Sequence, residues 1–318
     1  MIVKYKVIFC GTPPIAVEIL KGLESLEVEI VGVISQPDRM VGRKKEITYP
    51  PVKQYALEKG YKVLQPQKVG EAFEEIKSLE ADFMITCAFG QFIPQKVLDL
   101  FKNSINVHAS LLPKYRGGSP IHYAIMNGEK ETGISLMKMI KKMDAGEVYA
   151  QESLEILNTD DNGSLFEKMG VLGKNMIQKY LMDIFENKLV GVEQDETKVT
   201  FAYNLPNEQE KIDWQLPSEN IHNFIRALSP KPIAFSLLGE ERIKIKKSEL
   251  VDLEQLAHFN SSDFENGQIV LVDKKGMLVK TVDGFLRIVE LQRSGKKMSH
   301  ANTFNISKTN EEEILKFI

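Results

Sequence analysis

The stretch Lys6-Val-Ile-Phe-Cys10, followed at once by Gly11-Thr-Pro-Pro14, decides the fold that we predict for this chain. A short apolar run that contains valine, isoleucine and phenylalanine is typical of a buried strand. The turn then leads into a helix, because proline in the first helical turn sacrifices no hydrogen bond. A strand, a tight turn and a helix in this order predict an α/β fold with a Rossmann-like, mainly parallel sheet.

The same alternation of apolar runs and amphipathic stretches continues over the first two hundred residues. We predict further strands at 29–35, 82–89, 104–108, 132–140 and 147–156, and helices that end near 26 and span 52–59 and 161–186. Apolar residues near helical spacing support the last of these helices. The turn at Gly11 lacks the Gly-x-Gly-x-x-Gly pattern of dinucleotide sites, which argues against a nicotinamide enzyme.

The length of 318 residues predicts two domains, because single hydrophobic cores rarely grow beyond a few hundred residues. We place the first domain at 1–189, a linker at 190–207 and the second domain at 208–318. In the second domain Ser218 is a candidate cap for a helix that runs through Leu228. Short β-rich segments broken by glycines follow, and they predict a small OB-like β-barrel.

Composition limits the classes of function. A formal net charge of −3 gives no general sign of a nucleic-acid binder, so any RNA contact must depend on local basic patches. The chain starts without a signal-peptide pattern and has no apolar run long enough to span a bilayer. We therefore expect a cytoplasmic protein with no membrane partner. Cys10 and Cys87 lie in apolar runs and are predicted to be buried, reduced thiols.

Three polar residues are the candidates for chemistry. Asn106 and His108 are two apart on a predicted strand, so both side chains project from one face. An amide donor can stabilise an oxyanion, and an imidazole can move protons near neutral pH. Asp144, before Ala-Gly146, is the candidate acidic partner. Spacing alone still favours the plainer interpretation of a structural histidine and a turn-forming aspartate.

The longer motif changes this balance. Asn106-x-His108, followed by Ser110-Leu-Leu-Pro113 and Tyr115-Arg-Gly117 with Asp144 downstream, resembles the folate-dependent formyltransferase family. The resemblance implies the formyltransferase fold, 10-formyltetrahydrofolate as formyl donor, and no metal. It implies that Asn106 holds the formyl oxygen, that His108 assists proton transfer, and that Asp144 orients His108 and helps to deprotonate the amine. The folate site implied by the family consists of Ala88, Phe89, Gly90, Ser110, Leu111, Leu112 and Pro113.

Other segments resemble the members of this family that formylate initiator methionyl-tRNA. One is a basic insertion after the second strand, a second is Ile212-Asp-Trp214 at the opening of the C-terminal domain, and a third is Gly295-Lys-Lys-Met-Ser299. The implied tRNA-binding residues are Arg39, Arg43, Lys44, Lys45, Arg293, Lys296 and Lys297. The resemblance implies a monomer that formylates the α-amino group for translation initiation, with a tRNA-binding C-terminal domain. The plainer interpretation of the basic segments is a solvated loop and a polar hairpin.

Two alternatives stay open at this point. The acceptor could be an amino sugar nucleotide, because relatives with the same three residues act on such substrates, or the chain could be a non-catalytic RNA-binding protein. Three positions also depart from the family pattern, and one of them is Ala109, which replaces a frequent glycine. Ile15 stands where many relatives carry phenylalanine, and His122 stands where glutamine is usual.

Overall fold

The computed structural model describes residues 5–41, 46–252, 260–304 and 315–318. The chain forms two compact units. The first unit comprises Met1–Pro120, Glu131–Glu155 and Phe166–Tyr203, and the second comprises Ile121–Lys130, Ile156–Leu165 and Asn204–Ile318. This division differs from the predicted one, because residues 190–203 belong to the first unit and two internal segments belong to the second.

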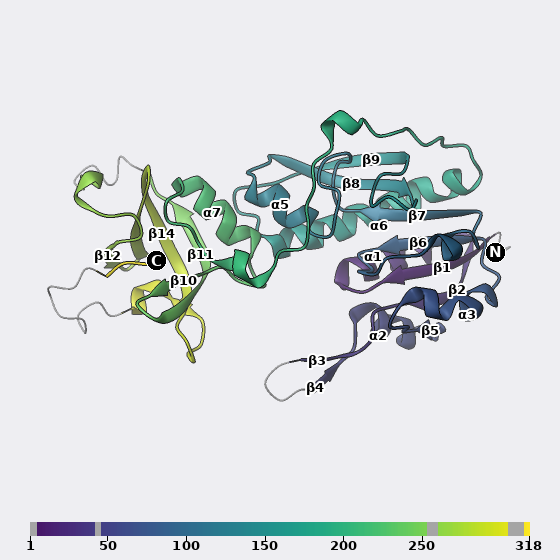
Figure 1. Cartoon of the computed structure of the whole chain (residues 1–318), viewed down its shortest axis with the longest axis horizontal. Coiled ribbons are helices and arrows are strands. Elements are labelled where there is room, and N and C mark those ends of the chain that lie inside the picture. Colours follow the sequence, from purple (N-terminus) through teal and green to yellow (C-terminus); the bar gives the residue numbers. More distant parts are fainter. Residues whose placement is uncertain (1–4, 42–45, 253–259, 305–314) are drawn as a thin grey trace. The chain divides into compact units, whose positions relative to one another are not determined.

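The first unit is built on a seven-stranded sheet with the order β5-β2-β1-β6-β7-β8-β9 (Figure 1). Strands β5, β2, β1, β6 and β7 are parallel, whereas β8 pairs antiparallel with both β7 and β9, which confirms the mainly parallel, Rossmann-like sheet. The strand bounds are β1 Tyr5–Gly11, β2 Val28–Ile34, β5 Val63–Leu64, β6 Phe83–Cys87, β7 Asn103–His108, β8 Glu131–Lys138 and β9 Val148–Glu155.

The helices include three short ones that the sequence did not predict. The α-helices are α1 Pro14–Leu23, α2 Pro51–Glu58, α3 Phe73–Lys77, α4 Gln95–Leu98, α5 Pro120–Met126, α6 Asn162–Phe185 and α7 Ser218–Ala227. The described 3-10 helices are η1 Val69–Ala72, η2 Glu196–Lys198, η3 Asn207–Glu210, η5 Ser261–Asp263 and η6 Ala301–Thr303. As expected from its prolines, α1 begins at Pro14.

Helices α1 and α6 pack closely in the first unit. A Cβ at Gly173 of α6 would lie 2.6 Å from the Cδ1 atom of Ile19, so the glycine permits the close approach of the two helices. Ile15 is buried on the same side and lies 3.6 Å from the Cβ position of Gly170. The side chain of Ile15 therefore fills the core between these helices.

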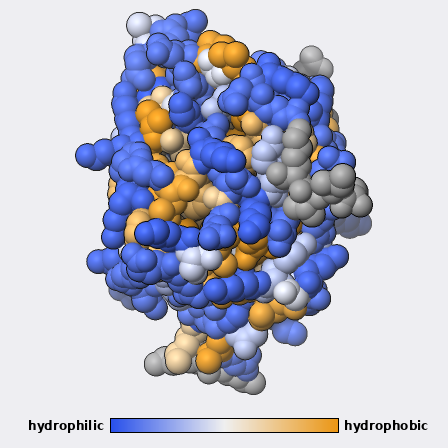
Figure 2. Space-filling view, turned by 90° about the vertical axis from the view of Figure 1, so that its right-hand side faces the viewer, coloured by the Kyte–Doolittle hydropathy of each residue, from blue (hydrophilic) through white to orange (hydrophobic). Residues whose placement is uncertain are grey.

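Figure 2 shows the surface from the side that lies at the right of Figure 1. Hydrophilic residues cover most of this side, and apolar residues reach the surface between them. A cavity of about 340 Å³ lies at the amino ends of β6 and β7, where Phe83, Asn103 and Tyr149 are among its lining residues. The carboxyl ends of these strands, at Cys87 and His108, lie at the opposite edge of the sheet.

The second unit contains an antiparallel sheet with the path β10-β11-β14-β13-β12, and β15 pairs with β14. The bounds are β10 Phe235–Leu238, β11 Glu241–Leu250, β12 Ile269–Asp273, β13 Gly276–Thr281, β14 Gly284–Gln292 and β15 Ser299–His300. Residues 315–318 hydrogen-bond to both edges of this path, at Leu237 of β10 and at Ile269 of β12. These terminal residues join the two edges, as a barrel-like sheet requires.

The predicted cap of α7 is wrong. Ser218 is the first helical residue, and Pro217 occupies the cap position without a side-chain hydrogen bond. The Ser218 hydroxyl instead lies 2.7 Å from the hydroxyl of Thr281, and the Ser218 amide donates to Asp283. Because its hydroxyl bonds across to the sheet, Ser218 ties the start of α7 to β13.

Cys10 and Cys87 are buried free thiols, as predicted. In the described ranges, no helix is long and apolar enough to cross a membrane.

Candidate active site

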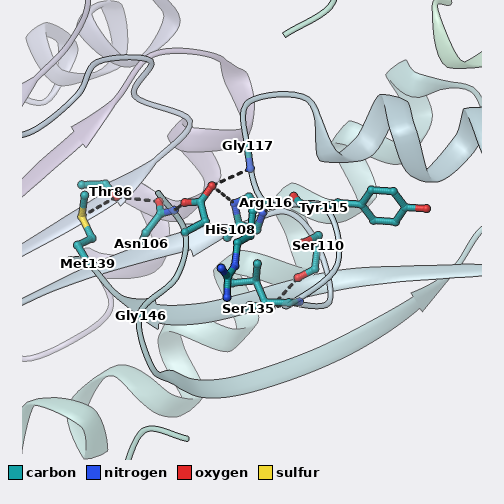
Figure 3. Close-up of polar contacts among 12 residues, drawn as sticks. Thr86, Asn106, His108, Ser110, Tyr115, Arg116, Gly117, Ser135, Met139 and Gly146 are labelled. Atoms are coloured by element: carbon teal, nitrogen blue, oxygen red, sulfur yellow. Dashed lines mark hydrogen bonds and ion pairs between the residues drawn. The ribbon is translucent and has the colours of Figure 1, made fainter. Parts of the chain in front are cut away.

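Asn106, His108 and Asp144 come together at the carboxyl end of β7 (Figure 3). Asn106 and His108 leave the strand on one side, and Asp144 reaches them from the loop that joins β8 to β9. All three side chains belong to the first unit. His108 is 5% exposed and the Asp144 side chain is 16% exposed, so the cluster is shielded from bulk water but still accessible.

The orientation of the Asn106 amide is fixed by Thr86 on the neighbouring strand β6. The Thr86 hydroxyl donates to Asn106 Oδ1 at 2.8 Å, and parallel pairing places Thr86 next to Asn106. Since Oδ1 accepts this bond, the amide nitrogen Nδ2 faces Asp144, whose Oδ1 lies 3.4 Å away. The structure therefore presents an N–H donor, rather than a carbonyl oxygen, toward the acidic group.

The hydrogen bond of His108 decides which ring nitrogen is available. Nε2 lies 2.9 Å from the carbonyl oxygen of Tyr115, and a carbonyl can only accept, so Nε2 carries a proton. Nδ1 faces Asp144 Oδ2 at 3.7 Å. A second proton on Nδ1 would form an ion pair with Asp144, so Nδ1 is the atom at which this residue can take up a proton.

Asp144 is held in an unusual backbone conformation. Its φ is +46°, in the left-handed region that costs a non-glycine residue about 1–2 kcal/mol. Its Oδ2 accepts a hydrogen bond of 2.8 Å from the amide of Gly117. Gly146 is required beside it, because a Cβ there would lie 1.9 Å from the carbonyl oxygen of Lys138. Strain of this kind persists only where the surroundings impose it.

The predicted folate residues of the loop after β7 have different environments. The Ser110 side chain is fully buried, and its hydroxyl donates to the carbonyl of Lys114 at 2.6 Å. Leu112 is also buried, whereas Leu111 and Pro113 are partly exposed. Ser110 therefore shapes the loop, and Leu111 and Pro113 are the members that can offer side chains to a ligand.

At the end of β6 the side chain of Phe89 lies in a hydrophobic cluster and is 5% exposed, while Ala88 and Gly90 are exposed. The Phe89 carbonyl accepts hydrogen bonds from Thr12 and Gln36. Any folate contact at this position would involve the backbone or the neighbours of Phe89, because its ring packs in the core.

Of the predicted tRNA-binding residues that the structure describes, Arg39 belongs to the first unit, and Arg293, Lys296 and Lys297 belong to the second. Arg39 is exposed on β3 Arg39–Val41, which pairs with β4 Glu46–Thr48 as a two-stranded ribbon (Figure 1). Arg43, Lys44 and Lys45 lie outside the described residues. In the second unit Lys296 and Lys297 are exposed in the turn after β14.

Arg293 differs from its neighbours in this turn. Its guanidinium forms a two-pronged pair with the Glu241 carboxylate, with hydrogen bonds of 3.1 Å and 2.5 Å. The hydrogen bond to Glu241 raises the pKa of Arg293. The charge of Arg293 is therefore already paired with Glu241.

His122, which departs from the family pattern, lies half-buried on α5 in the second unit, and burial lowers its pKa.

Two cavities of about 390 and 340 Å³ are lined by none of the predicted site residues. Among the described residues, no three His, Cys, Asp or Glu side chains gather in a way that could hold a metal ion.

Several residues that organise the site were not predicted from the sequence. Thr86 stands in an otherwise apolar run. A polar residue in a buried strand, next to the strand that carries Asn106 and His108, was the signal that could have indicated its role. Ser135 and Gln151 hold the loop after β7 through hydrogen bonds to Leu112. Gln194 reaches the Asp144 loop from the segment predicted to be a linker.

Both parts of the chain match models of known protein families. The model of the formyl transferase family matches residues 3–181, and the model of the formyl transferase C-terminal domain matches residues 204–309. A methionyl-tRNA formyltransferase of Mycoplasma capricolum subsp. capricolum is 51% identical over 313 residues, which cover 98% of each chain. That of Streptococcus pyogenes serotype M6 is 45% identical over 304 residues, or 94% of this chain and 95% of the relative.

Solved structures support the fold. An N-formyltransferase from Helicobacter canadensis, in complex with folinic acid and dTDP-3-aminofucose, has a TM-score of 0.68 at 23% identity and covers 91% of this chain and 100% of its own. A methionyl-tRNA formyltransferase from Clostridium thermocellum has a TM-score of 0.55 at 18% identity, covering 78% and 94%. At these identities the likeness concerns architecture alone.

Proposed function

We propose, because this chain belongs to the formyl transferase family, that it transfers the formyl group of 10-formyltetrahydrofolate to the α-amino group of methionyl-initiator-tRNA. The observation that carries this proposal is the identity of 45–51% to methionyl-tRNA formyltransferases over nearly the whole chain. The product, N-formylmethionyl-tRNA, serves translation initiation. We infer that the protein acts in the cytoplasm as a monomer.

The chemistry requires a new C–N bond between the amine and the formyl carbon, and loss of the bond from that carbon to N10 of the folate. A tetrahedral intermediate with a negative oxygen lies between these steps. Asn106 Nδ2, fixed by Thr86, is the donor suited to this oxygen. An amide held in one orientation before the reaction stabilises the developing charge without reorganisation at the moment of attack.

The amine must lose a proton, and the N10 leaving group must gain one. Asp144 is placed to accept the amine proton, because its carboxylate lies beside Asn106 and His108 and remains partly exposed. His108 can take up a proton only at Nδ1, next to Asp144 Oδ2, since Nε2–H is bonded to Tyr115. The net proton transfer from the amine to N10 balances the reaction, and it needs no metal.

We assign contact with the tRNA acceptor to basic residues other than the three catalytic candidates. Arg39 on the ribbon, with Arg43, Lys44 and Lys45 beyond it in the sequence, supplies cations that can neutralise phosphates. Lys296 and Lys297 supply exposed cations in the second unit. This distribution fits a large polyanion that touches two separate parts of the chain.

An acceptor panel tests the proposed function. Purified protein is incubated with 10-formyltetrahydrofolate and, in separate reactions, with methionyl-initiator-tRNA, with a dTDP-amino sugar, or with no acceptor. We expect N-formylmethionine after digestion of the tRNA, at a rate at least a hundred times that of sugar formylation or formate release. Faster formylation of the sugar than of the tRNA would show that the acceptor is an amino sugar nucleotide. Faster release of formate would show that the protein is a hydrolase.

A further inference from the structure

Gln194 contacts the loop that carries Asp144 on both sides of Ala145. Its side-chain amide nitrogen donates to the carbonyl oxygens of Asp144 and Gly146, each at 2.8 Å. These carbonyls belong to the left-handed residue Asp144 and to the second residue after it, so one amide group fixes the curvature of the turn. A glutamine side chain is suited to this task, because its NH2 group has two donors.

The other end of the same amide is held by Arg116. The Gln194 carbonyl oxygen accepts hydrogen bonds from Arg116 Nε at 3.1 Å and from Nη2 at 2.9 Å. Arg116 is completely buried, although it carries a full charge. Burial of a guanidinium is costly unless it is paired, so its partners must be held firmly in place.

Arg116 is itself anchored to the residues that surround the reacting groups. Its backbone pairs with the segment after Gln194, through hydrogen bonds to Thr200 and Ala202. The next residue, Gly117, donates its amide to Asp144 Oδ2, and Figure 3 shows Arg116 between Gly117 and the loop at Gly146. The guanidinium of Arg116 is therefore connected through the Gln194 amide to the backbone of Asp144, and the amide of Gly117 holds the Asp144 carboxylate.

A third contact supports the same loop from outside. Glu196 pairs with Arg116 at 2.9 Å and with Lys142, two residues before Asp144, at 2.8 Å. The hydrogen bonds from Arg116 and then from Lys142 lower the pKa of Glu196 to about 2. The pair of Glu196 with Lys142 is exposed and therefore screened by solvent, so the partly buried contacts of Gln194 hold the loop more firmly.

We propose that Gln194, held by Arg116, is a positioning residue for the formyl-transfer reaction that keeps Asp144 in its left-handed conformation beside Asn106 and His108. This inference rests on the proposed function, in which Asp144 accepts the amine proton. Residues 190–203 then complete the active site rather than link two domains. The donors of Gln194 stabilise a conformation that the Asp144 backbone would otherwise avoid.

The first test separates the two ends of the Gln194 amide. Gln194→Leu removes both donors and the acceptor, whereas Gln194→Glu keeps an acceptor for Arg116 but places a carboxylate against two carbonyl oxygens. We expect both variants to lower kcat by about 10- to 100-fold, since misplacement of a reacting group by about 1 Å costs rates of this size. KM for methionyl-tRNA and for 10-formyltetrahydrofolate should stay within about threefold.

A matched control and a double mutant distinguish positioning from general support. Gln178→Leu removes an exposed glutamine side chain on α6 and should leave kcat unchanged. In an Asp144→Asn background, Gln194→Leu should lower kcat by less than about twofold, because a residue that acts through Asp144 has nothing left to position. A further tenfold loss in that background would overturn the proposal.

The outcomes also separate this inference from the proposed function. If Asp144→Asn alone retains wild-type turnover, the catalytic role of Asp144 fails and the positioning role fails with it. If Asp144→Asn is inactive but both Gln194 variants have wild-type kcat, only the positioning role fails. Loss of the folded state in both Gln194 variants, measured by thermal unfolding, would also overturn it by giving Gln194 a general structural role.

Discussion

The amide of Asn106 illustrates how one hydrogen bond can assign a chemical role. A threonine on the adjacent strand donates to Oδ1, so the amide nitrogen is the group left to meet a substrate. If the amide were turned around, a carbonyl oxygen would face the carboxylate of Asp144 and the developing oxyanion. Both would be repelled. In the proposed mechanism, the strand register that pairs Thr86 with Asn106 therefore contributes to the orientation of the oxyanion donor.

Removal of the Asn106 side chain should abolish most of the oxyanion stabilisation. We expect Asn106→Ala to lower kcat by about a hundredfold or more, as loss of an oxyanion donor does in other enzymes. The measurement is a steady-state assay of formyl transfer with both substrates saturating. Turnover near that of the wild type would remove Asn106 from the mechanism.

Thr86→Val tests the orientation of this amide without touching the amide itself. The substitution leaves Asn106 Oδ1 without its donor, and a lost buried hydrogen bond costs about 1–3 kcal/mol. We expect kcat to fall about tenfold with little change in either KM. Thr132→Val, at another buried threonine of the same sheet, is the control and should retain activity. An equal loss in both variants would point to the sheet as a whole.

At the scale of elements, α7 shows how burial of a titratable group makes an element sensitive to pH. His222 lies on α7 with Nδ1 3.0 Å from the Ser248 hydroxyl of β11. Burial, followed by the charge of Arg226, lowers the pKa of His222 to about 4, although Glu219, Glu249 and a bond to the Asn158 backbone act in the opposite direction. The folded state therefore favours the neutral imidazole.

The sign of the effect on stability follows from this shift. The unfolded chain binds a proton at His222 near pH 6.5, and the folded chain does so only near pH 4. Stability from the neutral ring is fully present above pH 6.5 and is lost as the pH falls toward 4. Between pH 7 and pH 4.5, the second unit should lose about 2 kcal/mol more in the wild type than in His222→Gln.

Tryptophan fluorescence makes this measurement specific to the second unit. Trp214 is the single tryptophan of the chain and lies buried in the core of that unit. Urea unfolding followed at this residue gives the free energy at each pH. Parallel pH profiles of the free energy of unfolding for the wild type and His222→Gln would show that His222 does not cause the loss of stability at low pH.

The proposed function assigns tRNA binding to basic residues in and between the two strands of the β3–β4 ribbon. Charge reversal to glutamate at Arg43, Lys44 and Lys45 should raise KM for methionyl-tRNA by about tenfold or more and flatten its dependence on salt, because fewer counterions are released on binding. KM for the folate should not change. The same reversal at Lys62, Lys77 and Lys96, which are exposed elsewhere in the first unit, is the control. If the two triple variants raise KM for methionyl-tRNA equally, the weaker binding is due to the net charge of the protein and not to this segment.

At the scale of the whole molecule, the sequence predicted the larger features for clear physical reasons. Apolar runs and helical spacing placed most strands and the long helix to within a few residues, because burial of one face determines both patterns. The short helices α3 and α4 were missed, since four or five residues give too little periodicity. The convergence of Asn106 and His108 was predicted from their spacing on one strand.

What the sequence could not give was the set of contacts between distant segments. Nothing local to Gln194 indicates that it reaches Asp144, because the contact spans 50 positions of the chain. The predicted linker and the predicted domain division were also based on local patterns, which do not contain contacts between distant segments. The segments 121–130 and 156–165 belong to the second unit because of contacts that form only in the folded chain, and no local pattern indicates these contacts.

A labelled formyl group, followed through a single turnover, tests the proposed formyl transfer to methionyl-tRNA. Enzyme in excess is mixed with methionyl-initiator-tRNA and 10-formyltetrahydrofolate carrying a ¹³C-formyl group, and the methionine and formate are analysed by mass spectrometry. We expect the label to be recovered as N-formylmethionine, with one tetrahydrofolate formed for each formyl group transferred. Recovery of the label as free formate, with the methionine unmodified, would contradict it.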